Sequence, residues 1–111
     1  MTQYPNIISI KASSLKEILT QETAVIVEFG TIWSGASHIV APILNNLMND
    51  FPDIKMFRLD VEESPEIARD YGIFEFPTYL FFRNGILQDH VVGITSRQIL
   101  NEKLQELAQN K

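Results

Sequence analysis

The sequence contains no cysteine, and this excludes disulfides, thiolate metal sites and thiol catalysis for the chain as written. Histidine is almost as scarce: only His38 and His90 occur, and neither has neighbours at metal-ligand spacing. Basic residues number 9 against 14 acidic ones, for a net charge of −5. This balance argues against nucleic acid or an anionic membrane surface as a partner. Because cysteine is missing and the two histidines are isolated, we expect no metal ion, and we also expect no cofactor.

Long apolar runs are also missing, since no stretch approaches the roughly 20 residues of a membrane span. The first ten residues, MTQYPNIISI, lack the basic region and the long apolar region of a signal peptide, so we expect a cytoplasmic protein. What the sequence does have is 111 residues, of which 45% are hydrophobic. No linker or repeat divides them, so they predict a single domain over residues 1–111.

Hydrophobic patterns predict nine elements in the order β-α-β-α-β-α-β-β-α. Strands are expected at 6–10, 24–29, 54–61, 78–82 and 86–92. Helices are expected after Ser14, over 35–50, from Pro65 to a cap at Gly72, and after Thr95. The alternating start requires parallel strands, and the Asn84-Gly85 turn predicts an antiparallel hairpin. The predicted fold is α/β, with a mixed central sheet of about five strands flanked by four helices.

Capping signals indicate where three of these helices start. Ser14 with Glu17, and Thr95 with Gln98, each have the spacing of a capping box. Ser64 precedes Pro65 as an N-cap residue precedes a proline at the first helical position.

Three segments resemble the thioredoxin family. VIVEFGTIWSGASHIVAPILNNL is similar to that family's strand with a buried acid, followed by Trp-Cys-Gly-x-Cys and a helix that contains proline. YGIFEFPTYLFFRNG resembles the strand that carries the family's cis-proline, and VVGITSRQIL resembles the glycine loop before the last helix. The resemblance covers nearly the whole chain, in the same order of elements. It departs at the two cysteine positions, which here hold Ser34 and Ser37.

The resemblance implies a site built from these segments. Ser34 and Ser37 take the cysteine positions, and Glu28 takes the place of the buried acid that accepts a proton from the second thiol. A cis peptide bond is implied before Pro77. A groove for protein or peptide substrates in an extended conformation, which could pair with it by β-augmentation, would be lined by Trp33, Gly35, Ala36, Phe76, Pro77, Gly93 and Ile94. A thioredoxin reductase would be a further partner if cysteines were present.

Glu28 allows two interpretations, of which we favour a former catalytic acid that is now idle, and we accordingly predict that Glu28→Leu stabilises the protein. It interrupts a strand of apolar residues, where a carboxylate is costly unless it is paired. An idle acid would make Glu28→Leu stabilising by roughly 1 kcal/mol or more. A paired acid, with Arg58 as the suggested partner, would make the same change destabilising.

Three functions follow for the serine pair. In the first, which the resemblance implies, the chain would be a thiol-disulfide oxidoreductase in which both redox cysteines are replaced, so that it would be redox-inactive and keep its groove. Alternatively, it is a natural redox-silent binding or chaperone-like module. A serine hydrolase with His38 as the base is the weakest reading, because no acid is placed to orient that histidine and no Gly-x-Ser-x-Gly elbow occurs. The simplest role of Ser34 is to cap a helix.

Overall fold

The computed structural model describes residues 3–31 and 34–109 and has a five-stranded sheet in the order β1-β3-β2-β4-β5. The strands are β1 (Ile7–Ile10), β2 (Ala24–Gly30), β3 (Ile54–Asp60), β4 (Thr78–Arg83) and β5 (Ile86–Val92). The strands β1, β3 and β2 are parallel, and β4 and β5 continue the sheet with antiparallel pairing. The predicted mixed sheet is therefore confirmed.

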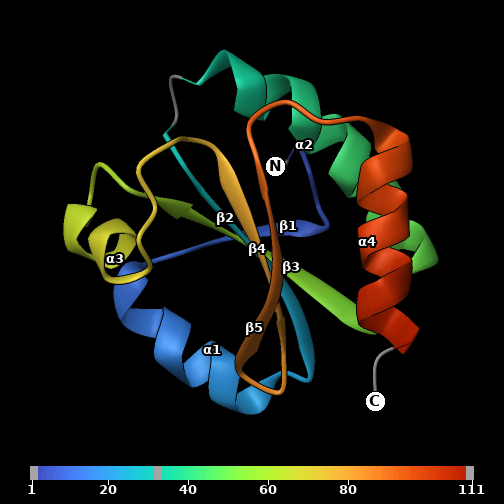
Figure 1. Ribbon diagram of the computed structural model, residues 1–111, viewed down its shortest axis with the longest axis horizontal. Helices are drawn as coiled ribbons and strands as arrows, with labels where there is room; N and C mark the ends of the chain where they lie inside the picture. The colour runs from blue at the N-terminus through green and yellow to red at the C-terminus, as the bar shows by residue number, and fades with distance from the viewer. Residues whose placement is uncertain (1–2, 32–33, 110–111) are drawn as a thin grey trace.

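Helices cover both faces of the sheet (Figure 1). They are α1 (Leu15–Gln21), α2 (Gly35–Leu47), α3 (Pro65–Asp70) and α4 (Arg97–Gln109). Short 3₁₀ turns precede α1 at Ala12–Ser14 and follow α2 at Met48–Asp50. The helices α2 and α4 pack on one face through buried side chains such as Leu44 and Leu104, and α1 and α3 pack on the other through Leu15 and Ala68. The architecture is a three-layer sandwich of helices, sheet and helices.

Neither capping box forms as predicted. Ser14 makes no side-chain cap bond, because its backbone is already helical within the 3₁₀ turn and an N-cap residue needs an extended backbone. The α4 cap lies one residue beyond the predicted one: the Ile99 N–H donates to Ser96 Oγ at 3.2 Å. Ser64 also makes no side-chain cap bond, although Pro65 starts α3 as expected.

Two turns follow the sequence signals closely. Gly72, two residues after the end of α3, has a φ of +69°, which a glycine adopts without strain. Asn84 and Gly85 both have positive φ, as the tight turn between β4 and β5 requires. Within the described ranges, no helix is long and apolar enough to cross a membrane.

Candidate functional site

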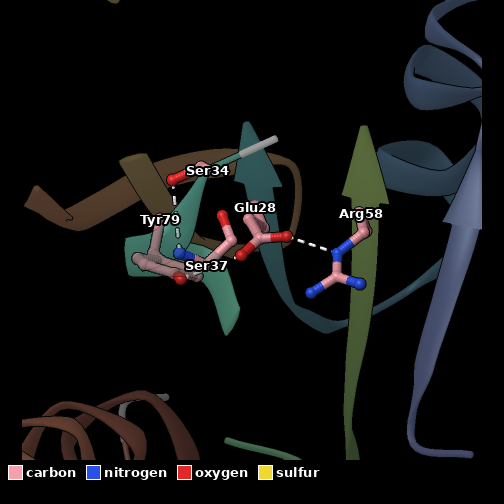
Figure 2. Close-up of polar contacts among 5 residues, drawn as sticks. All are labelled: Glu28, Ser34, Ser37, Arg58 and Tyr79. Atoms are coloured by element: carbon pink, nitrogen blue, oxygen red, sulfur yellow. Dashed lines mark hydrogen bonds and ion pairs between the residues drawn. The ribbon is translucent and has the colours of Figure 1, made fainter. Parts of the chain in front are cut away.

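The two serines lie at the N-terminus of α2 in different environments (Figure 2). Ser34 is the N-cap residue, and its Oγ accepts a hydrogen bond of 3.3 Å from the Ser37 N–H. Ser37 is 6% exposed. Its Oγ is buried and has no hydrogen-bond partner in the described part of the chain. One hydroxyl therefore stabilises the helix start, and the other is buried with no partner among the residues that the structure describes.

Glu28 lies at the centre of a polar row that crosses three strands. The register pairs Glu28 of β2 with Arg58 of β3 on one side and with Tyr79 of β4 on the other. Arg58 Nε donates to Oε1 of Glu28, and the Tyr79 hydroxyl donates to Oε2 at 2.8 Å (Figure 2). Glu28 is 1% exposed and Tyr79 is 0% exposed. The structure thus shows the paired form of the buried acid.

The same row affects Tyr79. Burial raises the pKa of its hydroxyl well above the usual value, and the nearby charge of Glu28 and the hydrogen bond to it act in the same direction, against the opposing charge of Arg58. The phenol therefore stays protonated and remains a donor at physiological pH. A neutral donor on one side and a cation on the other occupy both oxygens of the carboxylate.

Gly30 is the point where three parts of the site meet. A methyl group added there would lie 3.2 Å from Ser37 Oγ, 3.7 Å from Pro77 Cβ and 3.8 Å from Glu28 Cδ. The Phe76–Pro77 peptide bond is cis, as predicted, and the Gly93 N–H donates to the Pro77 carbonyl at 2.8 Å. The fold therefore brings the helix start, the buried acid and the proline loop to one place.

The remaining predicted groove residues take different positions. Gly35 and Ala36 form the first turn of α2. Phe76 and Ile94 present apolar surface, 40% and 62% exposed. The prediction for Trp33 falls outside the described residues.

A cavity of about 120 Å³ lies against the buried acid. Its lining consists of Glu28, Gly30, Thr31, Ser37, His38, Arg58, Leu59 and Asp60. No hydrogen bond joins the His38 ring to either serine in the described ranges, so the base that serine catalysis requires is not in place. Among the same residues, no group of three or more His, Asp or Glu side chains is arranged to hold a metal ion.

Comparison with known proteins agrees with this geometry. The family model described as thioredoxin matches residues 6–106. A chloroplastic M-type thioredoxin from Pisum sativum is 38% identical over 90 residues, which are 80% of this chain and 52% of that protein. Thioredoxin 1 from Nostoc sp. is 30% identical over 92 residues, which are 82% of this chain and 86% of that protein. The chain thus spans about half the length of the chloroplastic relative.

Solved structures agree on the fold. Mitochondrial thioredoxin 3 from Saccharomyces cerevisiae in its oxidised form has a TM-score of 0.85 at 23% identity, covering 96% of this chain and 100% of that one. A thioredoxin variant from Halobacterium salinarum has a TM-score of 0.86 at 20% identity, covering 100% and 98%. The fold and the sequence matches together define the class: this chain belongs to the thioredoxin family.

Two site residues were missed at the level of sequence. Tyr79 lies in the run TYLFF and reads there as an ordinary strand aromatic. Gly30 reads as the break after a strand. The signal that could have found Tyr79 is the alternation of side chains, which puts it on the same face as Phe81 once β4 is known to pair with β2.

Proposed function

We propose that this chain is a redox-silent member of the thioredoxin family that binds extended segments of other proteins. The observation that carries the proposal is the state of the family's two cysteine positions: they hold Ser34 and Ser37, while the loop of Pro77 still packs beside them around Gly30. Dithiol exchange needs two thiols, and the chain has no cysteine. We also propose the cytoplasm as its location.

The occupied carboxylate of Glu28 favours a binding role. An acid that serves as a proton acceptor must present a lone pair to the proton donor, and a hydrogen bond on each oxygen leaves fewer lone pairs for that role. Here Arg58 takes one oxygen and Tyr79 takes the other. A second candidate, a disulfide oxidoreductase in which both cysteines have been replaced, is supported by the position of Pro77 beside Ser37 around Gly30 and by the capping of α2 by Ser34. In that case thioredoxin reductase would be a partner only of the cysteine-containing form.

The groove can be tested with a permanently unfolded polypeptide, such as reduced α-lactalbumin with its cysteines blocked. Adding it to ¹⁵N-labelled protein should shift the amide signals of residues 34–37, 76 and 93–94. Phe76→Asp should weaken binding by about tenfold or more, because Phe76 supplies exposed apolar surface at the groove. Ile8→Asp on the far edge strand β1 is the matched control.

Insulin reduction with dithiothreitol tests the redox part separately. The chain should not increase the rate above that of dithiothreitol alone. Catalysed insulin reduction would contradict redox silence, and amide signals at the groove that do not move would contradict the binding function.

A further inference from the structure

The two faces of the sheet are covered unequally. The helices α2 and α4 have 13 residues each, whereas α1 and α3 on the opposite face have 7 and 6. On that less covered face, the edge strand β5 exposes 46% of Leu87 and 42% of Val92. The β5 end of this face therefore carries apolar surface that the short helices do not bury.

A groove of about 370 Å³ lies between β5 and the segment that follows α3. We call it the Phe74 groove, defined by the walls Tyr71, Phe74, Glu75, Leu87, His90 and Val92. Phe74 is 78% exposed, the largest exposed fraction among the large hydrophobic side chains of the described residues. Ser34, Ser37 and Pro77 do not line it, but Thr78 does, so the Phe74 groove adjoins the loop of Pro77 without including the serines.

One wall of the groove is held in place by aromatic packing. The Tyr71 ring lies 5.7 Å from the ring of Phe29 and 6.0 Å from that of Phe82, the latter in an edge-to-face arrangement. Such pairs fix the ring against the core. The Tyr71 side chain is therefore already ordered before a partner docks. Binding then costs less side-chain entropy, which favours it.

Addition of a strand to β5 is not the mode that the structure favours. The His90 N–H on this edge strand already donates to the Asp89 carboxylate at 2.8 Å, and Lys103 of α4 pairs with the same carboxylate. A side chain that occupies an edge donor and places charge on the edge hinders pairing with another strand. This edge therefore favours an occupant that binds through side chains over an added strand.

The charges around the groove select among such occupants. Glu75 is the only acidic or basic side chain in the lining apart from His90, and Asp70 lies next to Tyr71 in the chain. The chain as a whole has a net charge of −5, so a second copy would bring like charge to the groove. We propose that the Phe74 groove docks an amphipathic helix of another protein, with apolar side chains against Phe74, Leu87 and Val92 and a lysine or arginine facing Glu75.

The test uses two designed helical peptides with the same leucine stripe, one with lysine and one with glutamate on the polar face. Titration of each into ¹⁵N-labelled protein at physiological salt reports where and how tightly it binds. The lysine peptide should shift the amide signals of residues 71–75 and 87–92 and bind about tenfold or more tightly than the glutamate peptide. Phe74→Ser should weaken its binding by about tenfold, and Glu75→Gln by a few-fold.

Ile8→Ser is the matched control, because Ile8 is 49% exposed on β1 at the opposite edge of the sheet and its loss should change binding less than twofold. Equal binding of both peptides, or equal effects of Phe74→Ser and Ile8→Ser, would overturn the proposal. Signals that move only at residues 34–37, 76 and 93–94 would overturn it and leave the peptide groove of the proposed function standing. Shifts at 71–75 that grow with protein concentration and without peptide would instead assign the groove to a second copy.

Discussion

The hydroxyl of Tyr79 donates a hydrogen bond of 2.8 Å to Oε2 of Glu28 inside the core of the sheet. Together with Arg58 on Oε1, it satisfies a carboxylate that is only 1% exposed. A buried charge is tolerated when it is paired and hydrogen-bonded, so Glu28 is part of the structure of the sheet. The interpretation favoured from the sequence, an idle and costly acid, is therefore wrong, because Glu28 is paired with Arg58 and Tyr79.

Glu28→Leu should therefore destabilise the protein. The substitution leaves the buried Tyr79 hydroxyl without its acceptor and removes the partner of Arg58, and a buried unsatisfied group alone costs about 1–3 kcal/mol. The Arg58 side chain is 31% exposed and can turn to water, which limits its share. We expect a loss of about 2–4 kcal/mol in a urea titration.

A double variant of Glu28→Leu and Tyr79→Phe measures how much of this loss comes from the Tyr79 hydroxyl. In a Tyr79→Phe background, Glu28→Leu should cost about 1 kcal/mol less, because no hydroxyl is then orphaned. An unchanged or increased stability of the single variant would show that the carboxylate is a net burden despite its partners.

Alkaline pH should weaken the protein through the same tyrosine. In the unfolded chain a tyrosine ionises near pH 10, whereas the folded protein raises the pKa of Tyr79 above that value. The stabilisation is therefore complete below pH 10 and is lost as the pH rises above it, at up to about 1.4 kcal/mol per pH unit. Between pH 10 and 11 the parent should lose about 1 kcal/mol more than Tyr79→Phe in matched urea titrations. Parallel pH profiles would contradict this.

The two serines should respond to alanine with opposite signs. Ser34→Ala removes the hydrogen bond that the Ser37 N–H donates to Ser34 Oγ. The free energy of unfolding should fall by about 1 kcal/mol. Ser37→Ala removes a buried hydroxyl without a partner in the described ranges, so stability should stay constant or rise by up to about 1 kcal/mol. Thermal or urea unfolding measures both. Ser96→Ala at the N-cap of α4 is the control and should match the loss at Ser34. A clear loss for Ser37→Ala would show that its hydroxyl is bonded in solution.

The sequence predicts only part of the fold and of the site. The strand and helix order, the cap at Ser34, the hairpin turn at Asn84 and the cis bond before Pro77 each leave a local signal in composition, spacing or family motif. The sequence does not predict the bond from Tyr79 to Glu28 until the strand pairing is known, because the bond depends on the register between two strands separated by about 50 residues in sequence. The caps at Ser14 and Thr95 were misplaced because several hydroxyl residues adjoin each helix start, and the backbone conformation decides between them.

Restoring the sulfurs tests whether the frame around Ser34 and Ser37 still supports redox chemistry. Ser34→Cys with Ser37→Cys should reduce insulin faster than dithiothreitol alone, with Ser34→Cys alone as the control that cannot close a disulfide between the two positions. If Glu28 accepts the proton of a thiol at position 37, as the resemblance implies, the Tyr79 hydroxyl holds one of the two oxygens that could receive it. Adding Tyr79→Phe to the double variant should then raise the rate by roughly two- to tenfold, since a hydrogen bond of this kind contributes about 0.5–1.5 kcal/mol. Equal rates with and without Tyr79→Phe would show that the hydrogen bond does not restrain the acid. A double variant that does not exceed dithiothreitol in either background would instead place the chain among binding modules whose site no longer supports exchange.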